Sequence, residues 1–331
     1  MSKDHCQKIS ESRDADIGIE RSCPTIGLAV LTYQRNRVLR KNLETISAVV
    51  HLLNEVIVVD NCSTTPAAVV CENYPWVTLI RSDRNMGAAG RNLAFSNTKS
   101  DVLITLDDDV MGLRAEHIQM ILDRFKDPQI AAVNFRVTED GTGKLVNWVH
   151  HRDSNLYSNT SFDTYEITEG AVAFRVSAIA ETGGYPEKFF LSHEGPDLAF
   201  RIINRQQRVI YAPEIVVTHE FAPESRATSR NYYFDTRNAY WLAARNFPLL
   251  YGIGAVSRQV AGTLFFSVRD GFLLTWLKAT CHGIAGLRWA LKTRQSLSPT
   301  SMRRIKEMDS ERLGLIATLR RKLRSSITKL D

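Results

Sequence analysis

Three adjacent aspartates follow an apolar run near residue 107. Residues 103–106 read LITL, and Asp107, Asp108 and Asp109 come directly after them. Like charges this close repel one another, and removing water from them is costly. A plain explanation is that a buried strand reaches the surface and a loop begins. The alternative is a site for Mg²⁺ or Mn²⁺, because these cations prefer oxygen ligands and complete their shell with substrate phosphates.

The elements around the aspartates must bring further groups to such a site. Short apolar runs typical of strands alternate with segments that carry apolar residues at helical spacing. The strands are 26–33, 55–60, 76–82 and 101–109, and the helices are 35–49, 84–98 and 114–125. This alternation predicts an α/β fold with a mostly parallel sheet flanked by helices. Ligands of such sheets bind beyond the carboxyl ends of the strands.

Polar residues follow all four of these strands. They are Thr32, Tyr33, Arg35, Asp60, Asn61, Ser63, Asn85, Gly87, Gly90, Arg91, Asn92 and the three aspartates. We expect them to line one cleft that holds a nucleotide, since a carboxylate accepts the imide N–H of uracil or thymine and glycines let the backbone approach phosphate or ribose. The glycines of RNMGAAGRN fit neither the Walker nor the Rossmann spacing. A tightly packed helix start is therefore an equal alternative for that stretch.

The aspartates then have a chemical role. A metal ion that bridges a diphosphate stabilises the charge that grows on this leaving group. Because side chains alternate along a strand, Asp107 and Asp109 point the same way if the strand continues through them. Asp108 then points elsewhere, for example toward ribose.

These motifs together resemble a known family. T-Y-x-R, V-V-D-N-C-S, N-x-G-x-x-G-R-N and L-D-D-D occur here in the order and spacing of the family 2 glycosyltransferases with the GT-A fold, from residue 25 to about residue 245. The resemblance implies inverting transfer of a sugar from a UDP- or dTDP-sugar, with Mg²⁺ or Mn²⁺ as cofactor. It also implies that Asp60 contacts the base, and that Asp107 and Asp109 bind the diphosphate and the metal.

We assign the donor site on this basis. The residues expected to bind the nucleotide sugar are Thr32, Arg35, Asp60, Asn61, Asn85, Gly87, Arg91, Asp107 and Asp108, and those expected to bind the metal are Asp107, Asp109 and His219. His219 closes the apolar stretch VVTH, where enzymes that resemble this chain use a histidine as a metal or diphosphate ligand. An ordinary structural histidine is the alternative.

The resemblance also implies a carboxylate base that activates the acceptor hydroxyl. It commonly lies in a Glu-Asp-x-Asp-Leu stretch, which aligns here with residues 194–198, EGPDL. Gly195 occupies the place of the usual base aspartate, so we expect Glu194 to serve instead. Asp197 is the second candidate, although an aspartate at this point can simply cap a helix.

Several aromatic and imidazole side chains have two interpretations each. His193 either orients the base or contacts the acceptor. Trp148, His150 and His151 lie in a loop-rich stretch on the acceptor side. They either stack on a sugar or belong to a solvated loop.

The C-terminal third is predicted to be helical. Arg230 and Arg237 either reach the diphosphate or belong to a helix packed over the cleft. Apolar clusters at 249–291 are interrupted by cations, so no uncharged stretch reaches the roughly 18 to 20 residues of a membrane span. With the basic residues of 303–329 they suit peripheral contact with an anionic membrane. A helical bundle packed on the catalytic domain or on a second subunit is the alternative.

Length and composition set the domain plan. A chain of 331 residues, 44% hydrophobic and 24% charged, can hold one large α/β domain and an appendage. We expect a tail over 1–23, a catalytic domain over 24–228 with a nucleotide-binding half (24–137) and an acceptor half (138–228), and a basic helical extension over 229–331. The net charge of +6 fits an anionic partner without indicating nucleic acid. Five cysteines without metal-ligand spacing indicate reduced thiols in the cytosol.

These observations predict an inverting glycosyltransferase, similar to bacterial rhamnosyltransferases, at the cytoplasmic face of the inner membrane. Its expected acceptor is a glycan or a sugar chain on a polyprenyl diphosphate, in the synthesis of cell-surface or exported polysaccharide. The oligomeric state stays open. Two other classes remain: a non-catalytic relative that binds nucleotide sugars, suggested by Gly195, and a nucleotidyltransferase, which the TYQRN opening disfavours because it lacks a glycine-rich signature.

Overall fold

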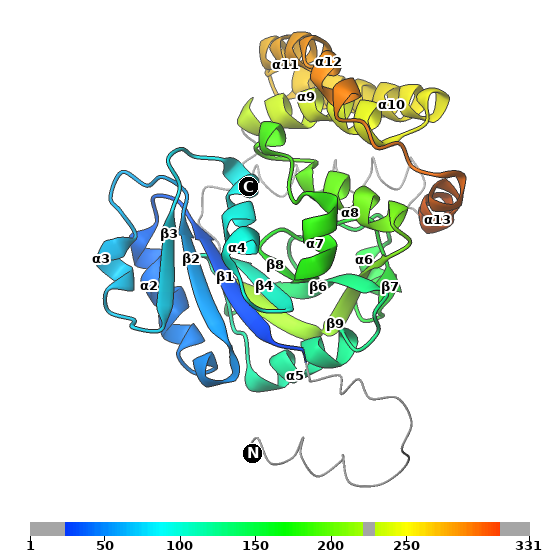
Figure 1. The fold of residues 1–331 in the computed structure, drawn as a ribbon. Helices are drawn as coiled ribbons and strands as arrows, with labels where there is room; N and C mark the ends of the chain where they lie inside the picture. The colour runs from blue at the N-terminus through cyan, green and yellow to red at the C-terminus, as the bar shows by residue number, and fades with distance from the viewer. Residues whose placement is uncertain (1–23, 221–228, 312–331) are drawn as a thin grey trace, which may run out of the picture.

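The computed structural model describes residues 24–220 and 229–311. Its core is a nine-stranded sheet in the order β3-β2-β1-β4-β8-β6-β9-β5, with β7 paired to β9. The strands are β1 Ile26–Thr32, β2 Glu55–Asp60, β3 Val77–Arg81, β4 Val102–Asp107, β5 Val110–Met111, β6 Ile130–Glu139, β7 Phe162–Asp163, β8 Ala171–Arg175 and β9 Arg208–His219. Figure 1 shows this curled sheet with helices packed around it. The predicted α/β fold is confirmed.

The sheet is parallel in its first half and mixed in its second. β3, β2, β1 and β4 are parallel neighbours. Beyond them β8 pairs antiparallel with both β4 and β6, whereas β6 is parallel to β9. β9 is one long strand over residues 208–219. A register shift opposite residues 135 and 136 lets this one strand continue along β6.

Helices cover both faces of the sheet because strand side chains alternate. One face carries α2 Asn36–Ile46, α3 Ala68–Cys71 and α5 Ala115–Arg124, and the other carries α4 Arg91–Asn97, α7 Val176–Thr182 and α8 Glu194–Asn204. Leu28 of β1 is in one core cluster with Leu39 of α2, and the adjacent Ala29 is in another with Ala94 of α4. Burial on two sides explains why these strands read as continuous apolar runs.

Two short 3₁₀ turns precede helices α4 and α8. The predicted helix at 84–98 is a 3₁₀ turn, η2 Gly87–Gly90, followed directly by α4. A second such turn, η3 Glu187–Phe189, leads toward α8. The loop-rich stretch on the acceptor side contains only the single-turn helix α6 Ser154–Tyr157 and β7 among regular elements.

The C-terminal third is helical, as predicted. It consists of α9 Ser229–Asn246, α10 Leu249–Arg269, α11 Leu273–Ala285, α12 Leu287–Lys292 and α13 Pro299–Ser310. Figure 1 shows α9 to α12 gathered at one end of the molecule, with α13 reaching back beside the sheet domain. Ala243, Phe247 and Met302 share a core cluster with Leu198 of α8, so these helices pack onto the catalytic domain.

Some expectations concern residues outside the described ranges. These are the predicted tail at 1–23, the end of the catalytic domain at residue 228, and most of the basic segment at 303–329. Within the ranges that the structure does describe, no helix is long and apolar enough to cross a membrane.

Candidate active site

Parallel pairing brings three strand ends to one edge of the sheet. Thr32, the last residue of β1, lies opposite Asp60, the last residue of β2. On the other side of β1, Leu31 lies opposite Asp107, the last residue of β4. The donor-site residues predicted after these strands are therefore neighbours in space.

Only the first of the three aspartates belongs to the strand, and the other two lie in the turn that follows it. β4 ends at Asp107, and the chain turns before β5, so the expected alternation does not extend to Asp109. Asp107 forms an ion pair with Arg91 of α4. Asp108 and Asp109 both bind Nη1 of Arg35, at 3.1 Å in the case of Asp108. The group thus divides into one aspartate held by Arg91 and two that share Arg35.

Asp108 is the buried member of the group. It is 3% exposed, and its two oxygens accept hydrogen bonds from Oγ1 of Thr32 at 2.7 Å and from Arg35. Burial raises the pKa of Asp108 to about 7, although Arg35 and Thr32 oppose the shift. The hydrogen bond between Thr32 and Asp108 therefore joins β1 to the turn after β4, which also carries Asp109.

Asp109 meets His219 because two short strands pair. β5 runs antiparallel to β9 and sets Val110 opposite His219, and the N–H of Glu220 donates to the Asp109 carbonyl at 2.9 Å. Nε2 of His219 lies 3.5 Å from Oδ1 of Asp109. This distance joins two residues 110 positions apart in the chain, and both are predicted metal ligands.

These side chains fit a divalent cation that arrives with a diphosphate. Among residues 24–220 and 229–311, no three or more His, Cys, Asp or Glu side chains form a complete metal cage. Mg²⁺ sites commonly use only one or two protein carboxylates and fill the rest of the shell with water and substrate phosphates. Asp109 and His219 supply two converging ligands, and Arg35 already places a cationic group on Asp109.

Asp60 shapes the loop that follows β2. It is fully buried; Oδ1 accepts from the N–H of Ser63 at 2.8 Å, and Oδ2 accepts from the N–H of Ala67 at 3.0 Å and from Arg81 at 3.3 Å. A carboxylate that collects several donors in this way fixes the backbone around it. The loop over 61–67 is therefore preorganised beside the strand ends.

Asn61 connects this loop to the turn η2. Its amide group donates to Oδ1 of Asn85 and to the carbonyl of Gly87, and its Oδ1 accepts from the N–H of Met86 at 2.9 Å. Gly87 has a φ of +59°, and a Cβ there would lie 1.9 Å from the carbonyl oxygen of Phe190. Only glycine allows this close approach. The alternative interpretation of the RNMGAAGRN stretch, a tightly packed helix start, therefore describes part of the role of Gly87.

Glu194 begins helix α8. It is 3% exposed, and its Oε2 accepts no hydrogen bond from the part of the chain that the structure describes. Burial raises the pKa of Glu194 to about 7, with Arg91 acting in the opposite direction. A carboxyl group with a pKa near neutrality can take up a proton at physiological pH.

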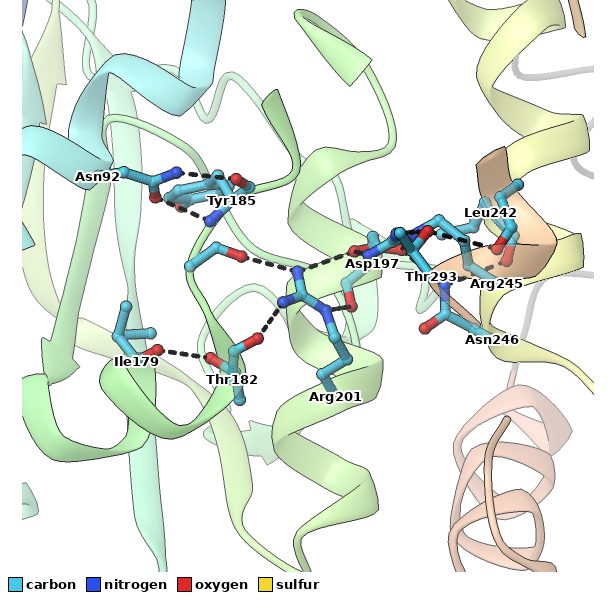
Figure 2. A network of polar contacts seen from close by, with 12 residues as sticks. Asn92, Ile179, Thr182, Tyr185, Asp197, Arg201, Leu242, Arg245, Asn246 and Thr293 are labelled. Atoms are coloured by element: carbon cyan, nitrogen blue, oxygen red, sulfur yellow. Dashed lines mark hydrogen bonds and ion pairs between the residues drawn. The ribbon is translucent and has the colours of Figure 1, made fainter. Parts of the chain in front are cut away.

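Asp197 has a different environment on the same helix. Figure 2 shows its carboxylate between Arg201 of α8 and Arg245 and Asn246 of α9, at 2.8, 2.8 and 2.7 Å. Burial acts to raise the pKa of Asp197, but the two guanidinium groups and Asn246 together lower it below its ordinary value. A fully buried carboxylate with these partners holds helices together and is a weak proton acceptor.

Sequence reasoning missed one carboxylate in this region. Glu169 is half-buried in the turn before β8, and an ideal Cβ at Gly195 would lie 2.1 Å from its Oε1. Burial raises the pKa of Glu169 well above its ordinary range, Glu194 adds to the shift, and Arg91 opposes it. The only local signal was an acidic residue placed directly before a glycine and an apolar strand.

Residues on the acceptor side form a packed cluster. His150 is 3% exposed, lies 3.1 Å from Oγ1 of Thr164, and packs its ring against Trp148 and Tyr211. Burial lowers the pKa of His150 to about 3. His151 contacts Glu166 at 2.7 Å. The burial of His150 differs from the predicted solvated loop, whereas stacking on a sugar stays a prediction for this stretch.

Helix α9 holds the loop that precedes α8. The side-chain amide of Asn238 donates to the carbonyls of Phe189, Leu191 and Ser192, and Arg237 donates to those of Lys188 and Phe189. Of the two interpretations given for Arg237, the structure therefore matches the one in which it belongs to a packed helix. His193 contacts the carbonyl of Asp235 at 3.3 Å and has a left-handed backbone.

Known proteins resemble this chain in sequence. Residues 28–182 match the family described as "Glycosyl transferase family 2". The O-antigen chain rhamnosyltransferase RfbN of Salmonella typhimurium (strain LT2) is 29% identical over 226 residues, which covers 64% of this chain and 71% of that protein. The O-antigen chain rhamnosyltransferase WbaN of Salmonella anatum is 24% identical over 200 residues, covering 55% and 61% of the two chains.

Solved structures resemble it in fold. A mannosyltransferase from Pyrobaculum calidifontis superposes with a TM-score of 0.52 at 18% identity, over 98% of this chain and 86% of that one. TarS from S. aureus, residues 1–349, gives a TM-score of 0.54 at 16% identity, over 87% and 89%. The sequence matches, the fold and the gathered strand ends lead to one conclusion: residues 28–182 are a family 2 glycosyltransferase domain, and the chain has the GT-A fold.

Proposed function

We propose that this glycosyltransferase moves a sugar from a UDP- or dTDP-sugar, with inversion, to a glycan or a lipid-linked acceptor during synthesis of a cell-surface or exported polysaccharide. The observation that carries this proposal is the convergence of Asp109 and His219, 3.5 Å apart, beside the strand ends. The names of the two Salmonella relatives, both O-antigen chain rhamnosyltransferases, support the substrate class.

The donor diphosphate lies, in this proposal, over the turn after β4. Asp109 and His219 hold the metal, with Asp107 as the third predicted ligand, and a bound Mg²⁺ or Mn²⁺ stabilises the charge that develops on the leaving diphosphate. Structures of a mannosyltransferase with GDP-mannose and Mn²⁺ and of a GalNAc-transferase with UDP and Mn²⁺ support this cofactor class. Arg35, with its side chain 51% exposed, can contact phosphate while it keeps its pair with Asp108, once a metal takes its place on Asp109.

The nucleoside lies against the loop that Asp60 organises. Because Asp60 is fully buried and accepts from two backbone N–H groups, we assign it to holding the 61–67 loop in the shape that the base meets. Asn61, Asn85 and Gly87 extend the same surface toward η2. Arg91, which is 4% exposed, keeps Asp107 oriented.

The acceptor approaches the first turn of α8. An inverting displacement needs a carboxylate that removes the proton of the acceptor hydroxyl, on the side opposite the departing diphosphate. Of the two bases predicted from the sequence, Asp197 is bound by Arg201, Arg245 and Asn246. We therefore propose that the proton goes to the acidic group around Glu194, whose pKa near 7 suits the task.

A peripheral contact with an anionic membrane is proposed for the C-terminal helices. Large apolar side chains are exposed on α10, α11 and α12, at Leu249, Leu250, Ile253, Phe265, Val268, Leu273, Leu274, Leu277, Ile284 and Leu291. Exposed cations lie among them, at Arg258, Lys278, Arg288 and Lys292. Apolar side chains with neighbouring cations match a lipid surface that carries anionic headgroups, and such a surface at the cytoplasmic face of the inner membrane would present a polyprenyl-linked acceptor.

A donor screen tests the proposal. The wild-type protein is heated with Mn²⁺ and, in turn, UDP-glucose, UDP-galactose, UDP-N-acetylglucosamine and dTDP-rhamnose, and each sample is compared with Mn²⁺ alone. One of the nucleotide sugars should raise the midpoint of thermal unfolding by several degrees, because a ligand that binds only the folded state stabilises it. Release of the nucleoside diphosphate on longer incubation separates an enzyme from a non-catalytic relative. A screen over all UDP- and dTDP-sugars without stabilisation would contradict the donor class.

A further inference from the structure

Gly195 leaves a space on the first turn of α8, and Glu169 fills it. An ideal Cβ at Gly195 lies 2.1 Å from Oε1 of Glu169 and 3.2 Å from Cβ of Ile167. A side chain therefore cannot stand at position 195 while Glu169 keeps its place. A side chain at position 195 would therefore displace the carboxylate of Glu169, which is the flexible end of that side chain.

The turn that carries Glu169 is fixed on both sides. The N–H of Thr168 donates to Oδ1 of Asn134 at 2.7 Å, and the carbonyl of Gly170 accepts from the N–H of Asp107 at 3.1 Å. Gly170 has a φ of +79°, and a Cβ there would lie 2.3 Å from Cγ of Asp107. Glu169 is therefore held between the end of β4, where the diphosphate is proposed to lie, and the start of α8.

Arg91 is the cation that faces this acidic group. It forms an ion pair with Asp107, and its charge also interacts with Glu169 and Glu194. One guanidinium group cannot neutralise three carboxylates in a buried place, so the Glu169–Glu194 pair retains a proton more readily than isolated carboxylates do. The pair can therefore accept and release a proton at a higher pH than isolated carboxylates do.

We infer that Glu169 is the general base of the transfer and replaces the aspartate that the resembling family carries at position 195. This inference rests on the proposed function. As whole residues, Glu169 is half-buried and Glu194 is 3% exposed, so Glu169 is the more open of the two. Glu194, whose charge acts on Glu169, is then a positioning residue.

The Glu169 carboxylate takes the proton of the acceptor hydroxyl, and the acceptor oxygen forms a bond to C1 of the sugar. The bond between C1 and the diphosphate oxygen breaks, and its electron pair leaves with the nucleoside diphosphate. Attack from the side opposite the leaving group inverts the configuration at C1, and no covalent enzyme intermediate forms.

A carboxylate exchange tests the inference. The variants are Glu169→Gln, Glu169→Ala, Gly195→Asp and the double variant Glu169→Ala/Gly195→Asp. Turnover is followed as release of nucleoside diphosphate from the stabilising donor among UDP-glucose, UDP-galactose, UDP-N-acetylglucosamine and dTDP-rhamnose, with Mn²⁺ and water as the acceptor, and donor binding is measured by calorimetry. Glu169→Gln should lower kcat about 100-fold or more, the usual contribution of a general base, and leave donor Kd almost unchanged.

The double variant separates base chemistry from structure. It moves the carboxylate from position 169 to position 195 and removes the clash, so its kcat should exceed that of Glu169→Ala about tenfold or more. Gly195→Asp should also lower the urea midpoint more in the wild-type background than in Glu169→Ala, because only the first retains the clash. This stability cycle requires no activity.

Three outcomes would overturn the inference. The first is a kcat of Glu169→Gln close to that of the wild type. The second is loss of turnover in Glu194→Gln while Glu169→Gln keeps its turnover. The third is an equal effect of Gly195→Asp on the urea midpoint in the wild-type and Glu169→Ala backgrounds. Failure of the wild-type protein to bind any of the four nucleotide sugars has a different meaning. It contradicts the proposed function, whereas normal donor binding with unchanged turnover in Glu169→Gln contradicts only the role of Glu169.

Discussion

Asp197 of α8 and Arg245 of α9 form a buried ion pair that joins the sheet domain to the C-terminal helices. Nε of Arg245 lies 2.8 Å from Oδ1 of Asp197, and the two side chains are 9% and 0% exposed. Arg201 adds a second guanidinium group at 2.8 Å. The first helix of the extension is thus fastened to the helix whose N-terminus carries Glu194. The extension and the catalytic domain therefore depend on each other for stability.

Breaking this pair should destabilise the whole protein. Asp197→Asn leaves two buried guanidinium groups without their carboxylate, a change that typically lowers the free energy of unfolding by about 3–5 kcal/mol. The measurement is urea unfolding of the full chain. Glu187→Gln is the matched control, because the Arg84–Glu187 pair is 72% and 55% exposed, and an exposed pair contributes about 1 kcal/mol or less. Equal effects of the two substitutions would refute the role of Asp197.

Glu194 should make stability depend on pH. Its pKa is about 7 in the folded protein and near 4.3 in an unfolded chain, so the folded state holds more protons between these values. The free energy of unfolding therefore falls as pH rises from about 4.5 to 7 and is constant with respect to this group above that range. Glu169, Asp107, Asp235 and Arg91 surround Glu194 and act on the same equilibrium.

Glu194→Gln should flatten that dependence. Urea midpoints of the variant and the wild type, measured from about pH 5 to 8, should converge at low pH, with the variant more stable at high pH because it has no charge to bury. Glu187→Gln, at an exposed pair, serves as the control that keeps the wild-type slope. A Glu194→Gln variant with the same slope as the wild type would show that Glu194 is ionised in the folded protein.

Gly87 should tolerate no side chain. A Cβ at this position meets the Phe190 carbonyl at 1.9 Å and also requires a left-handed backbone. Gly143 has a similar φ of +66° with nothing within 4 Å, so Gly143→Ala isolates the backbone effect of about 1–2 kcal/mol. Gly87→Ala should cost more than Gly143→Ala in thermal unfolding and should weaken donor binding, because η2 and the 190–193 loop must separate. Similar losses in both variants would contradict the close approach.

The exposed apolar side chains of α10 and α11 should mediate lipid binding. Leu250 and Leu274 are 84% and 80% exposed, and Leu156 on α6, at 73%, is the control outside these helices. Leu274→Gln should lower partitioning onto phosphatidylglycerol-containing vesicles about fivefold, equivalent to about 1 kcal/mol of lost apolar transfer. Leu156→Gln should change nothing. Binding to pure phosphatidylcholine as strong as to phosphatidylglycerol would contradict the role of the neighbouring cations.

Periodicity and motif order predicted the parallel half of the sheet well. The runs that became β1, β2 and β4 are buried on both faces, so their composition alone marks them. Thr32, Asp60 and Asp107 were expected at one edge because parallel strands end together. The reversal of direction at β8 left no local trace. It depends on which strand edge is available after β4, a property of the assembled sheet.

Side-chain partners were harder to predict than positions. The sequence indicated Glu194, Asp197 and Gly195, but two of the partners of Asp197, Arg245 and Asn246, come from α9, 48 and 49 residues further along the chain. Glu169 lies 26 residues before Gly195, and only the packed turn brings them together. The orientation of the aspartates was likewise set by where β4 ends, which a hydrophobic pattern does not fix to the residue.

The central claim is a metal held by Asp109 and His219 against the diphosphate of a nucleotide sugar. Calorimetric titration of the stabilising UDP- or dTDP-sugar, with Mn²⁺ and with EDTA, tests it most directly, using Asp109→Asn, His219→Ala and the control Asp140→Asn, whose side chain is 59% exposed. The account predicts binding that needs Mn²⁺, that weakens about tenfold or more in the first two variants, and that is unchanged in the control. Donor binding of equal strength without metal, or in Asp109→Asn and His219→Ala, would contradict it.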